Sequence, residues 1–254
     1  MAITISVALQ KGGVGKTTTA QTLASILGSK KKKVLLVDMD SQCNATDISG
    51  VDAPEFSIIN LLAQQCGIDD AIIPCNYYDL LAADEKLANV EKLEDIDLTL
   101  LKSTLEQVQD KYDYIIIDTP PALGNLLESS LRASDYVLIT TDPRSLALRG
   151  MDALQVTIED AQSSNRALKV LGILLVKYHD RTILNRQMRD VLEKRAELMH
   201  TVVFDAYIRE GIAVPESQAM QMNLIDYAPK SNPSIDYKAF TEEVIKRVGV
   251  MNNV

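Results

Sequence analysis

The chain has 254 residues, of which 46% are hydrophobic and 24% charged, with a formal net charge of −9 and a pI near 4.8. This size and composition suffice for the core of one α/β domain, and no stretch approaches the ~18 uninterrupted apolar residues of a membrane-spanning helix. The acidic balance excludes a surface that is basic throughout, so nucleic-acid binding would require a local patch. The N-terminal stretch lacks a signal-peptide layout, and the spacing of Cys43, Cys66 and Cys75 suggests neither disulfides nor a zinc site, so we expect a cytoplasmic protein with reduced thiols.

A glycine-rich loop follows the first apolar stretch. Residues 3–8 (ITISVA) read as a buried parallel strand, and residues 11–18 read K-G-G-V-G-K-T-T. A helix is expected next, because apolar residues recur at helical spacing at Ala20, Leu23, Ala24 and Leu27. Glycines 12, 13 and 15 permit backbone angles closed to other residues, so that successive N–H groups can point at an anion. The pattern therefore predicts a phosphate-binding loop.

Two side chains of this loop carry the expected chemistry. Lys16 would reach the β- and γ-phosphates, and the Thr17 hydroxyl would ligate the bridging Mg²⁺. The strict motif G-x-x-x-x-G-K-[ST] fails, because Gln10 stands where it requires glycine, and an additional lysine opens the loop. The alternative is a plain tight turn with solvated lysines. The expected ATP-binding residues are Lys11, Gly12, Gly13, Val14, Gly15, Lys16, Thr17 and Thr18.

Carboxylates follow two further expected strands. Residues 34–37 (VLLV) are followed by Asp38 and Asp40, and residues 114–117 (YIII) by Asp118. Ligands of doubly wound sheets sit outside the carboxyl ends of the strands, so these acids should flank the same site as the loop. Asp118 fits the Walker B position, beside a metal that it holds through water. Such residues at strand ends are also common as turn or helix-cap residues, which is the alternative.

The rest of the chain alternates helices and strands, as in a largely parallel sheet. We expect helices over residues 57–65, 146–164 and 183–199, a further helix that Asp97 caps, and strands over residues 78–82, 136–140, 170–176 and 201–208. Residues 84–97 contain no pattern that indicates a catalytic or binding site. The fold class expected is a single P-loop NTPase domain over residues 1–254, with a doubly wound, mostly parallel sheet and helices on both faces.

Three segments together resemble the ParA/Soj family of partition ATPases, within the ParA/MinD group. They are K-G-G-V-G-K-T-T-T, V-L-L-V-D-M-D-S-Q-C-N-A-T and Y-I-I-I-D-T-P-P-A-L-G, with a weaker E-S-Q-A motif near the C-terminal end. The resemblance covers nearly the whole chain and implies the small type, without an N-terminal DNA-reading domain. It implies that Lys11 crosses an ATP-dependent homodimer to the partner's phosphates, that Asp40 positions the attacking water and that Asp38 holds Mg²⁺ through water. The catalytic residues implied are thus Lys11, Lys16 and Asp40, with residues 119–124 as a second switch.

This resemblance also implies non-specific binding to double-stranded DNA and a ParB-like activator. Arg181 matches the arginine of a D-x-R-T turn, and Arg186 and Arg189 follow it, although interleaved acids leave a solvated helix face as the alternative. Glu210 and Ala213 replace arginines of relatives, so we expect weak, salt-sensitive DNA binding, or none. The switch segment also departs from the family, with Ser41 for proline and Cys43 for glycine.

Three functions remain open. The leading one is a slow, Mg-dependent, partner-stimulated ATP hydrolase that separates a plasmid, chromosome or mobile element, in the cytoplasm or on the nucleoid. The alternatives are a MinD-like positioning switch that acts on membrane or protein cargo, and a nucleotide-binding subunit without useful hydrolysis. No membrane contact is expected, because the last helix places Tyr237, Phe240, Val244 and Val248 on one face and carries few basic residues, as in a helix docked on the core.

Overall fold

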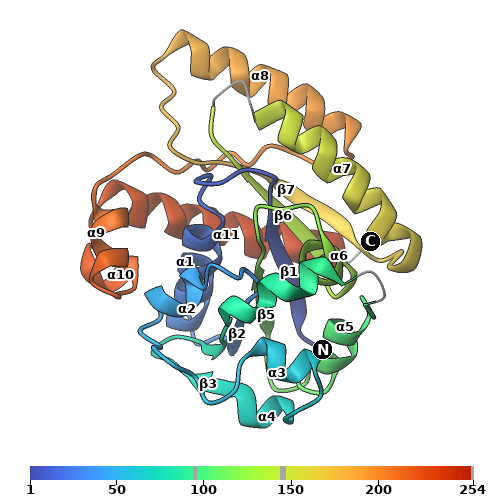
Figure 1. Ribbon diagram of the computed structural model, residues 1–254. Helices are drawn as coiled ribbons and strands as arrows, with labels where there is room; N and C mark the ends of the chain where they lie inside the picture. Colours follow the sequence, from blue (N-terminus) through green and yellow to red (C-terminus); the bar gives the residue numbers. More distant parts are fainter. Residues whose placement is uncertain (94–95, 144–146, 253–254) are drawn as a thin grey trace.

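A seven-stranded sheet forms the centre of the computed structural model, which describes residues 1–93, 96–143 and 147–252 (Figure 1). The strand order is β3-β4-β2-β5-β1-β6-β7, and β3 is antiparallel to β4, whereas the other neighbours are parallel. The fold is that of a P-loop NTPase, as expected. The strands are β1 (Ile3–Ala8), β2 (Val34–Asp38), β3 (Ile72–Pro74), β4 (Asp79–Leu81), β5 (Tyr114–Asp118), β6 (Tyr136–Thr141) and β7 (Lys169–Leu175).

Helices cover both faces of the sheet (Figure 1). Ile5 and Val7 of β1 pack in one hydrophobic cluster with residues of the first and last helices, whereas Ala8 packs in another with residues of the seventh and eighth. This division follows from the pleat, which sends successive side chains to opposite faces. The helices are α1 (Lys16–Ser29), α2 (Asn44–Ile48), α3 (Ile58–Leu62), α4 (Ile68–Ala71), the 3₁₀ helix η1 (Glu85–Lys92), α5 (Leu100–Glu106), α6 (Asn125–Arg132), α7 (Ala147–Ser164), α8 (Ile183–Leu198), α9 (Ala213–Ala219), α10 (Leu224–Tyr227) and α11 (Asn232–Asn252).

The strands that position the site agree with the sequence-based expectations. Strand β1 has the expected bounds, β2, β5 and β6 each extend one residue further, and β7 begins and ends one residue earlier than expected. These strands read as continuous apolar runs because both faces of a parallel sheet are covered by helices. The expected helix over residues 146–164 is present as α7, although residue 146 lies outside the described residues.

One expected strand is wrong. Residues 201–208 run parallel to β7 but form isolated bridges in place of a strand, one between Val203 and Ile173 of β7 and one between Ile208 and Val176, the residue after β7. Between these bridges the N–H groups of Asp205 and Ala206 donate to the carboxylate of Glu243 in α11, at 3.0 Å each. The segment therefore leaves the sheet because a side chain of the last helix satisfies its backbone groups.

The middle of the chain holds shorter elements than expected. Helix α3 and strand β4 each occupy part of the predicted ranges 57–65 and 78–82, whereas β3 and α4 had no sequence prediction. Asp97 accepts hydrogen bonds from the N–H and hydroxyl of Thr99, at 2.9 and 2.6 Å. Thr99 is itself the N-cap residue of α5, so the prediction that Asp97 caps this helix is wrong. These elements are short because few apolar residues at helical spacing are available to them.

Helix α11 is docked on the core along its predicted face. Tyr237, Phe240, Val244 and Val248 are each at most 1% exposed, and the Phe204 and Phe240 rings meet edge to face with centroids 5.0 Å apart. The Tyr237 hydroxyl and the Thr19 hydroxyl lie 3.0 Å apart, which joins α11 to α1. In the described part of the chain, no helix has the length and apolarity that crossing a membrane requires.

A pair of glycine substitutions tests this packing. A Cβ on Gly172 in β7 would lie 2.3 Å from the Phe204 ring, so Gly172→Ala should lower the free energy of unfolding by about 1–3 kcal/mol. Gly249 of α11 has nothing within 4 Å of its Cβ position, so Gly249→Ala should raise that free energy by up to about 1 kcal/mol. Urea unfolding measures both, and a Gly172→Ala protein as stable as the parent would contradict the close contact.

Candidate functional site

The glycine-rich loop connects the central strand β1 to α1. Gly13 and Gly15 have φ angles of 73° and 75°, as expected for residues that turn the chain toward an anion, whereas Gly12 does not have a positive φ. The prediction for Gly12 is thus wrong in this structure. The Val14 side chain is completely buried in the cluster beneath α7 and α8, so only its backbone can face a ligand. Val14 therefore anchors the loop to the core.

Lys16 begins α1 and is 7% exposed. Its Nζ donates to the carbonyl oxygen of Lys11 at 3.1 Å, so the ammonium group lies over the glycine-rich loop. Burial lowers the pKa of this ammonium group, and the negative charges of Asp118 and Asp40 oppose that shift. The structure therefore brings Lys16 together with two of the acids that the sequence assigned to the same site.

Asp38 and Asp118 lie side by side at the carboxyl ends of β2 and β5. They are register partners in the sheet, and neither has any exposed surface. Asp38 Oδ2 accepts hydrogen bonds from the N–H and hydroxyl of Thr46, at 2.9 and 2.8 Å. Burial raises the pKa of Asp38 to about 6, although these hydrogen bonds favour its charged form. Asp38 thus holds the start of α2 by hydrogen bonds and also faces the site. Both alternatives from the sequence, a helix-cap residue and a site residue, therefore describe it.

Asp40 lies in the loop after β2 and is almost completely buried. Its Oδ1 accepts a hydrogen bond from the N–H of Gln42 at 3.0 Å, and its own N–H donates to Asp38 Oδ1 at 3.1 Å. The next turn brings Cys43 to a φ of 56° at the N-cap of α2. This is the left-handed region that favours glycine, so the cysteine at this position has a strained backbone.

Asp118 is the residue whose surroundings point to a cation. Among the described residues, neither of its carboxylate oxygens has a hydrogen-bond partner of normal geometry, although the side chain is completely buried. The Thr17 hydroxyl and the Lys16 ammonium group are nevertheless close enough to oppose the rise in its pKa. Burial and the charge of Asp38 raise the pKa of Asp118 well above its usual range. A buried carboxylate without partners is unfavourable, and a hydrated Mg²⁺ would supply both charge and hydrogen-bond donors.

The residues present fit a magnesium ion that is bound mainly by phosphate and water. In the described ranges no group of His, Cys, Asp and Glu side chains forms a complete protein cage for a metal. Mg²⁺ in nucleotide sites keeps several waters and uses few protein ligands, so the absence of a cage suits it. Thr17, partly exposed on the first turn of α1, and Asp118 would hold it, with Asp38 beside them.

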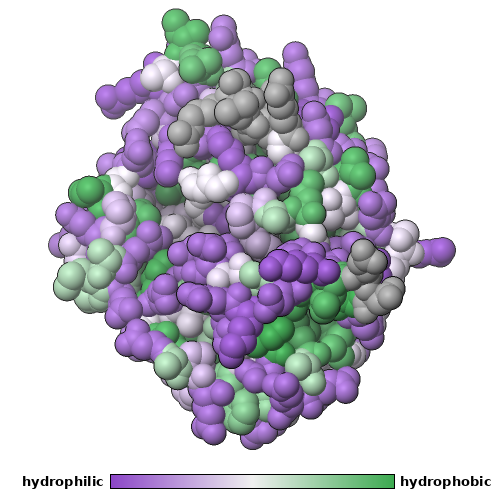
Figure 2. Space-filling view, viewed as in Figure 1, coloured by the Kyte–Doolittle hydropathy of each residue, from purple (hydrophilic) through white to green (hydrophobic). Residues whose placement is uncertain are grey.

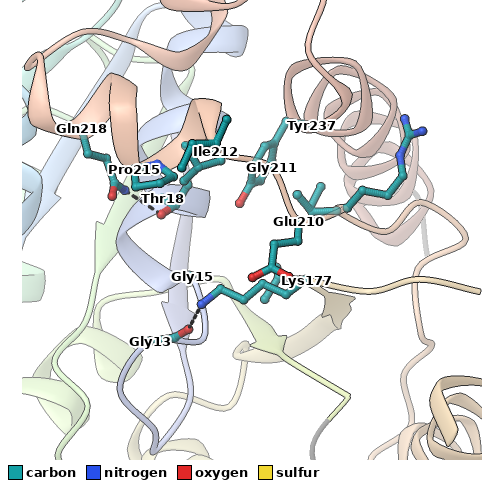
Figure 3. Close-up of a pocket in the computed structure, with 14 residues that line it drawn as sticks. Gly13, Gly15, Thr18, Lys177, Glu210, Gly211, Ile212, Pro215, Gln218 and Tyr237 are labelled. Carbon is teal, nitrogen blue, oxygen red and sulfur yellow. Dashed lines mark hydrogen bonds between the residues drawn. The ribbon is translucent and has the colours of Figure 1, made fainter. Parts of the chain in front are cut away.

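A cavity of about 510 Å³ opens beside the loop (Figure 3). Gly13, Gly15 and Thr18 line one side of it, and the segment from Ile208 to Ile212 with Pro215 and Tyr237 lines the other. Gln218 of α9 donates to the Thr18 hydroxyl at 2.8 Å, and Lys177 donates to the Gly13 carbonyl at 3.0 Å. The walls are mainly apolar, so the cavity suits a flat, uncharged group attached to the bound phosphates.

Gly13, Gly15 and Thr18 were predicted as nucleotide-binding residues, whereas the sequence analysis gave no such role to the rest of the cavity lining. A signal there was the weaker motif between Glu216 and Tyr237, which begins E-S-Q-A. Gln218 in that motif contacts Thr18 across 200 positions of sequence, a pairing that spacing alone cannot reveal. Glu210, named because an arginine was expected there, lines the cavity, whereas the Ala213 side chain is buried.

Lys11 and the candidate DNA-binding arginines differ in their surroundings. Lys11 Nζ donates to Asp142 Oδ1 of its own chain at 2.8 Å. Arg181 and Arg186 are exposed at the start of α8, while Arg189 pairs with Glu193 at 2.9 Å. Helix α8 lies beside α7 on the outside of the molecule (Figure 1), where hydrophilic and hydrophobic residues are mixed (Figure 2).

Comparisons with known proteins agree with this geometry. A family model described as an AAA domain matches residues 2–170. The chromosome-partitioning ATPase Soj of Thermus thermophilus is 34% identical over 96% of this chain and 96% of its own. The crystal structure of cobyrinic acid a,c-diamide synthase from Mycobacterium smegmatis, with bound ADP and magnesium, superposes with a TM-score of 0.85 at 29% identity and covers 98% of this chain and 96% of that one. The Pyrococcus furiosus cell division ATPase MinD superposes with a TM-score of 0.81 at 27% identity, with 97% and 99% covered.

Replacing the unpaired carboxylate tests its role in the site. Without metal, Asp118→Asn should raise the free energy of unfolding increasingly as the pH rises, by about 1 kcal/mol or more where Asp118 is ionised, because a neutral amide is cheaper to bury than a charge whose pKa burial has raised. Thermal unfolding with a chelator, measured from pH 6 to pH 9, tests this, and stabilisation by magnesium and nucleotide should be weaker in the variant. Asp113→Asn, at the opposite end of β5, is the matched control, since Asp113 accepts only from the Lys33 N–H near the surface. A destabilised metal-free Asp118→Asn protein would oppose this account.

Proposed function

Since the chain belongs to the ParA/Soj family of P-loop ATPases, we propose that it is an ATP-dependent dimerisation switch that hydrolyses ATP slowly to ADP and phosphate. The observation that carries the proposal is the meeting of Lys16, Asp38, Asp40 and Asp118 at the mouth of the phosphate loop. The buried acids have an excess of negative charge over Lys16, which suits a site completed by a metal and a nucleotide. The slow cycle would time the partition of a plasmid, chromosome or mobile element.

The nucleotide fits the site in one orientation. The triphosphate would lie over the loop, where the N–H groups around Gly13 and Gly15 and the start of α1 offer positive potential. The adenine base would enter the cavity between Pro215, Ile212 and the loop (Figure 3). The similar structure, which has ADP and magnesium bound, supports the binding of a nucleotide with magnesium by this fold.

Each charged residue then has a distinct role. Lys16 would leave the Lys11 carbonyl and donate to the β- and γ-phosphates, so that its charge opposes the charge developing on the transferred phosphoryl group. Asp40 would hold and orient the attacking water, because it lies in the loop that follows β2 at the edge of the site. Asp118 and Asp38 would hold hydrated Mg²⁺, which neutralises charge on the phosphate oxygens.

Partners follow from the family. Lys11 would contact the phosphates bound by a second copy of the chain, a ParB-like protein would accelerate turnover, and Arg181, Arg186 and Arg189 would contact DNA without sequence preference. Arg189 is the weakest candidate, because Glu193 already neutralises it. The similar protein Soj of Thermus thermophilus is a chromosome-partitioning ATPase, which supports this role. The cytoplasm, with a DNA-bound fraction on the nucleoid, is the proposed location.

Lys16→Ala tests the ATPase. Phosphate release should fall by about a hundredfold or more, because the transition state loses its principal cation from the protein. Lys32→Ala, in the exposed lysine run after α1, is the matched control and should turn over normally. Asp40→Ala should bind ATP but turn over far more slowly, whereas parental turnover in either site variant would sink the proposed mechanism.

Arg181→Ala tests DNA binding. The parent protein should co-sediment with DNA in ATP but not in ADP, and binding should weaken steeply as salt rises. Arg181→Ala should bind more weakly at every salt concentration and reduce the salt slope by about 1, whereas the exposed Arg166→Ala should not. Intact hydrolysis with no DNA binding at low salt would exclude a DNA role and point to a protein or membrane cargo.

A further inference from the structure

The additional lysine of the loop forms an ion pair within its own chain. Lys11 Nζ lies 2.8 Å from Asp142 Oδ1, and the two side chains are 21% and 1% exposed. Asp142 was not among the residues that the sequence analysis singled out. The partly exposed cation is therefore held by a carboxylate that is almost fully removed from water, where an ion pair is screened less than at the surface.

Both partners of this ion pair are attached to rigid structure. Asp142 directly follows β6, whose last residue, Thr141, accepts a backbone hydrogen bond from Val176 at 2.8 Å. At the other partner, α7 packs against the start of the loop, since a Cβ on Gly150 would lie 2.8 Å from the Gln10 carbonyl oxygen. The pair therefore cannot be an accident of mobile side chains alone, because the backbone fixes Asp142 beside the loop.

We propose that Asp142 is a positioning residue that retains Lys11 inside its own protomer while nucleotide is absent, and so sets the ATP concentration at which the dimer assembles. This inference rests on the proposed function, in which Lys11 contacts phosphates in the second copy. Lys11 cannot pair with Asp142 and reach across the interface at the same time. Assembly therefore requires the Lys11–Asp142 ion pair to open.

Electrostatics determine when the Lys11–Asp142 ion pair is closed and when it opens. Opening the pair removes a cation from a buried carboxylate, which is unfavourable. Phosphate oxygens of a bound triphosphate carry more charge than one carboxylate and accept charge-assisted hydrogen bonds, so they can compete for the ammonium group. Without a triphosphate in the partner, Lys11 has no comparable acceptor across the interface, and the pair stays closed.

Asp142→Asn is the direct test. The variant keeps the shape of the side chain but loses the charge that holds Lys11, so it should dimerise at a concentration of non-hydrolysable ATP analogue about tenfold lower, equivalent to ~1.4 kcal/mol. Sedimentation velocity across an analogue titration measures this. Asp142→Glu retains the carboxylate and should need nearly the parental concentration. The matched control is Asp135→Asn, which removes a carboxylate beside the opposite end of β6, where it accepts from the Thr4 N–H at 2.9 Å.

ADP affinity separates retention of Lys11 from a general change in charge. Asp142→Asn should leave ADP binding to the protomer unchanged, because ADP does not draw Lys11 across an interface. Equal tightening of ADP and the ATP analogue would mean that the variant merely repels phosphates less, and it would overturn the proposal. An unchanged analogue concentration for assembly would overturn it as well.

A double-mutant cycle in nucleotide-free protein tests the ion pair without reference to assembly. Lys11→Met and Asp142→Asn should each change the equilibrium constant for unfolding, and the double variant should depart from the product of the two changes. Independent effects would overturn the retention of Lys11. If the parent protein fails to dimerise at a saturating concentration of the ATP analogue, both the proposed function and the role of Asp142 in dimer assembly are wrong. Coupling between the two substitutions in this cycle would then support only the existence of the Lys11–Asp142 ion pair.

Discussion

Two buried carboxylates, Asp38 and Asp118, face the phosphate loop from adjacent strands, and this arrangement constrains everything around them. Asp38 satisfies one oxygen with the start of α2, whereas the oxygens of Asp118 make no hydrogen bond of normal geometry within the described residues. The core therefore maintains a concentration of negative charge that a folded protein normally avoids. The sheet can hold it because β2 and β5 are paired along their whole length and covered on both faces. These buried carboxylates lower the free energy of unfolding, and they form a site that is complete only with a cation and an anion bound.

The parts of the fold and site that were predictable are those that local pattern determines. Strand β1, the turn at Gly13 and Gly15 and the acids after β2 and β5 follow from apolar runs that end in particular residues. Parallel strands bring their carboxyl ends to one edge of a sheet, so Lys16, Asp38 and Asp118 could be placed together before any coordinates. The docked face of α11 was predictable because Tyr237 and Phe240 recur at helical spacing.

The remaining features depend on contacts between distant segments. Residues 201–208 have the composition of a strand, yet the carboxylate of Glu243 draws their middle away from β7. The cavity beside the loop is assembled from α1, α9 and the segment near Glu210, and Asp142 reaches Lys11 from a strand on the far side of β1. No periodicity marks such pairs in one sequence. The part of the site that holds phosphate was thus predictable, whereas the cavity and the partner of Lys11 were not.

The backbone of Cys43 bears on how readily the loop between β2 and α2 changes shape. Its left-handed conformation costs a residue with a side chain about 1–2 kcal/mol relative to the right-handed region. Any rearrangement that lets this residue rotate back recovers that energy, and 1–2 kcal/mol corresponds to a factor of about 5–30 in relative population. Relatives with glycine at this point store no such energy. The same loop in this chain is therefore biased toward leaving its resting shape, so the cysteine shifts an equilibrium without touching the nucleotide.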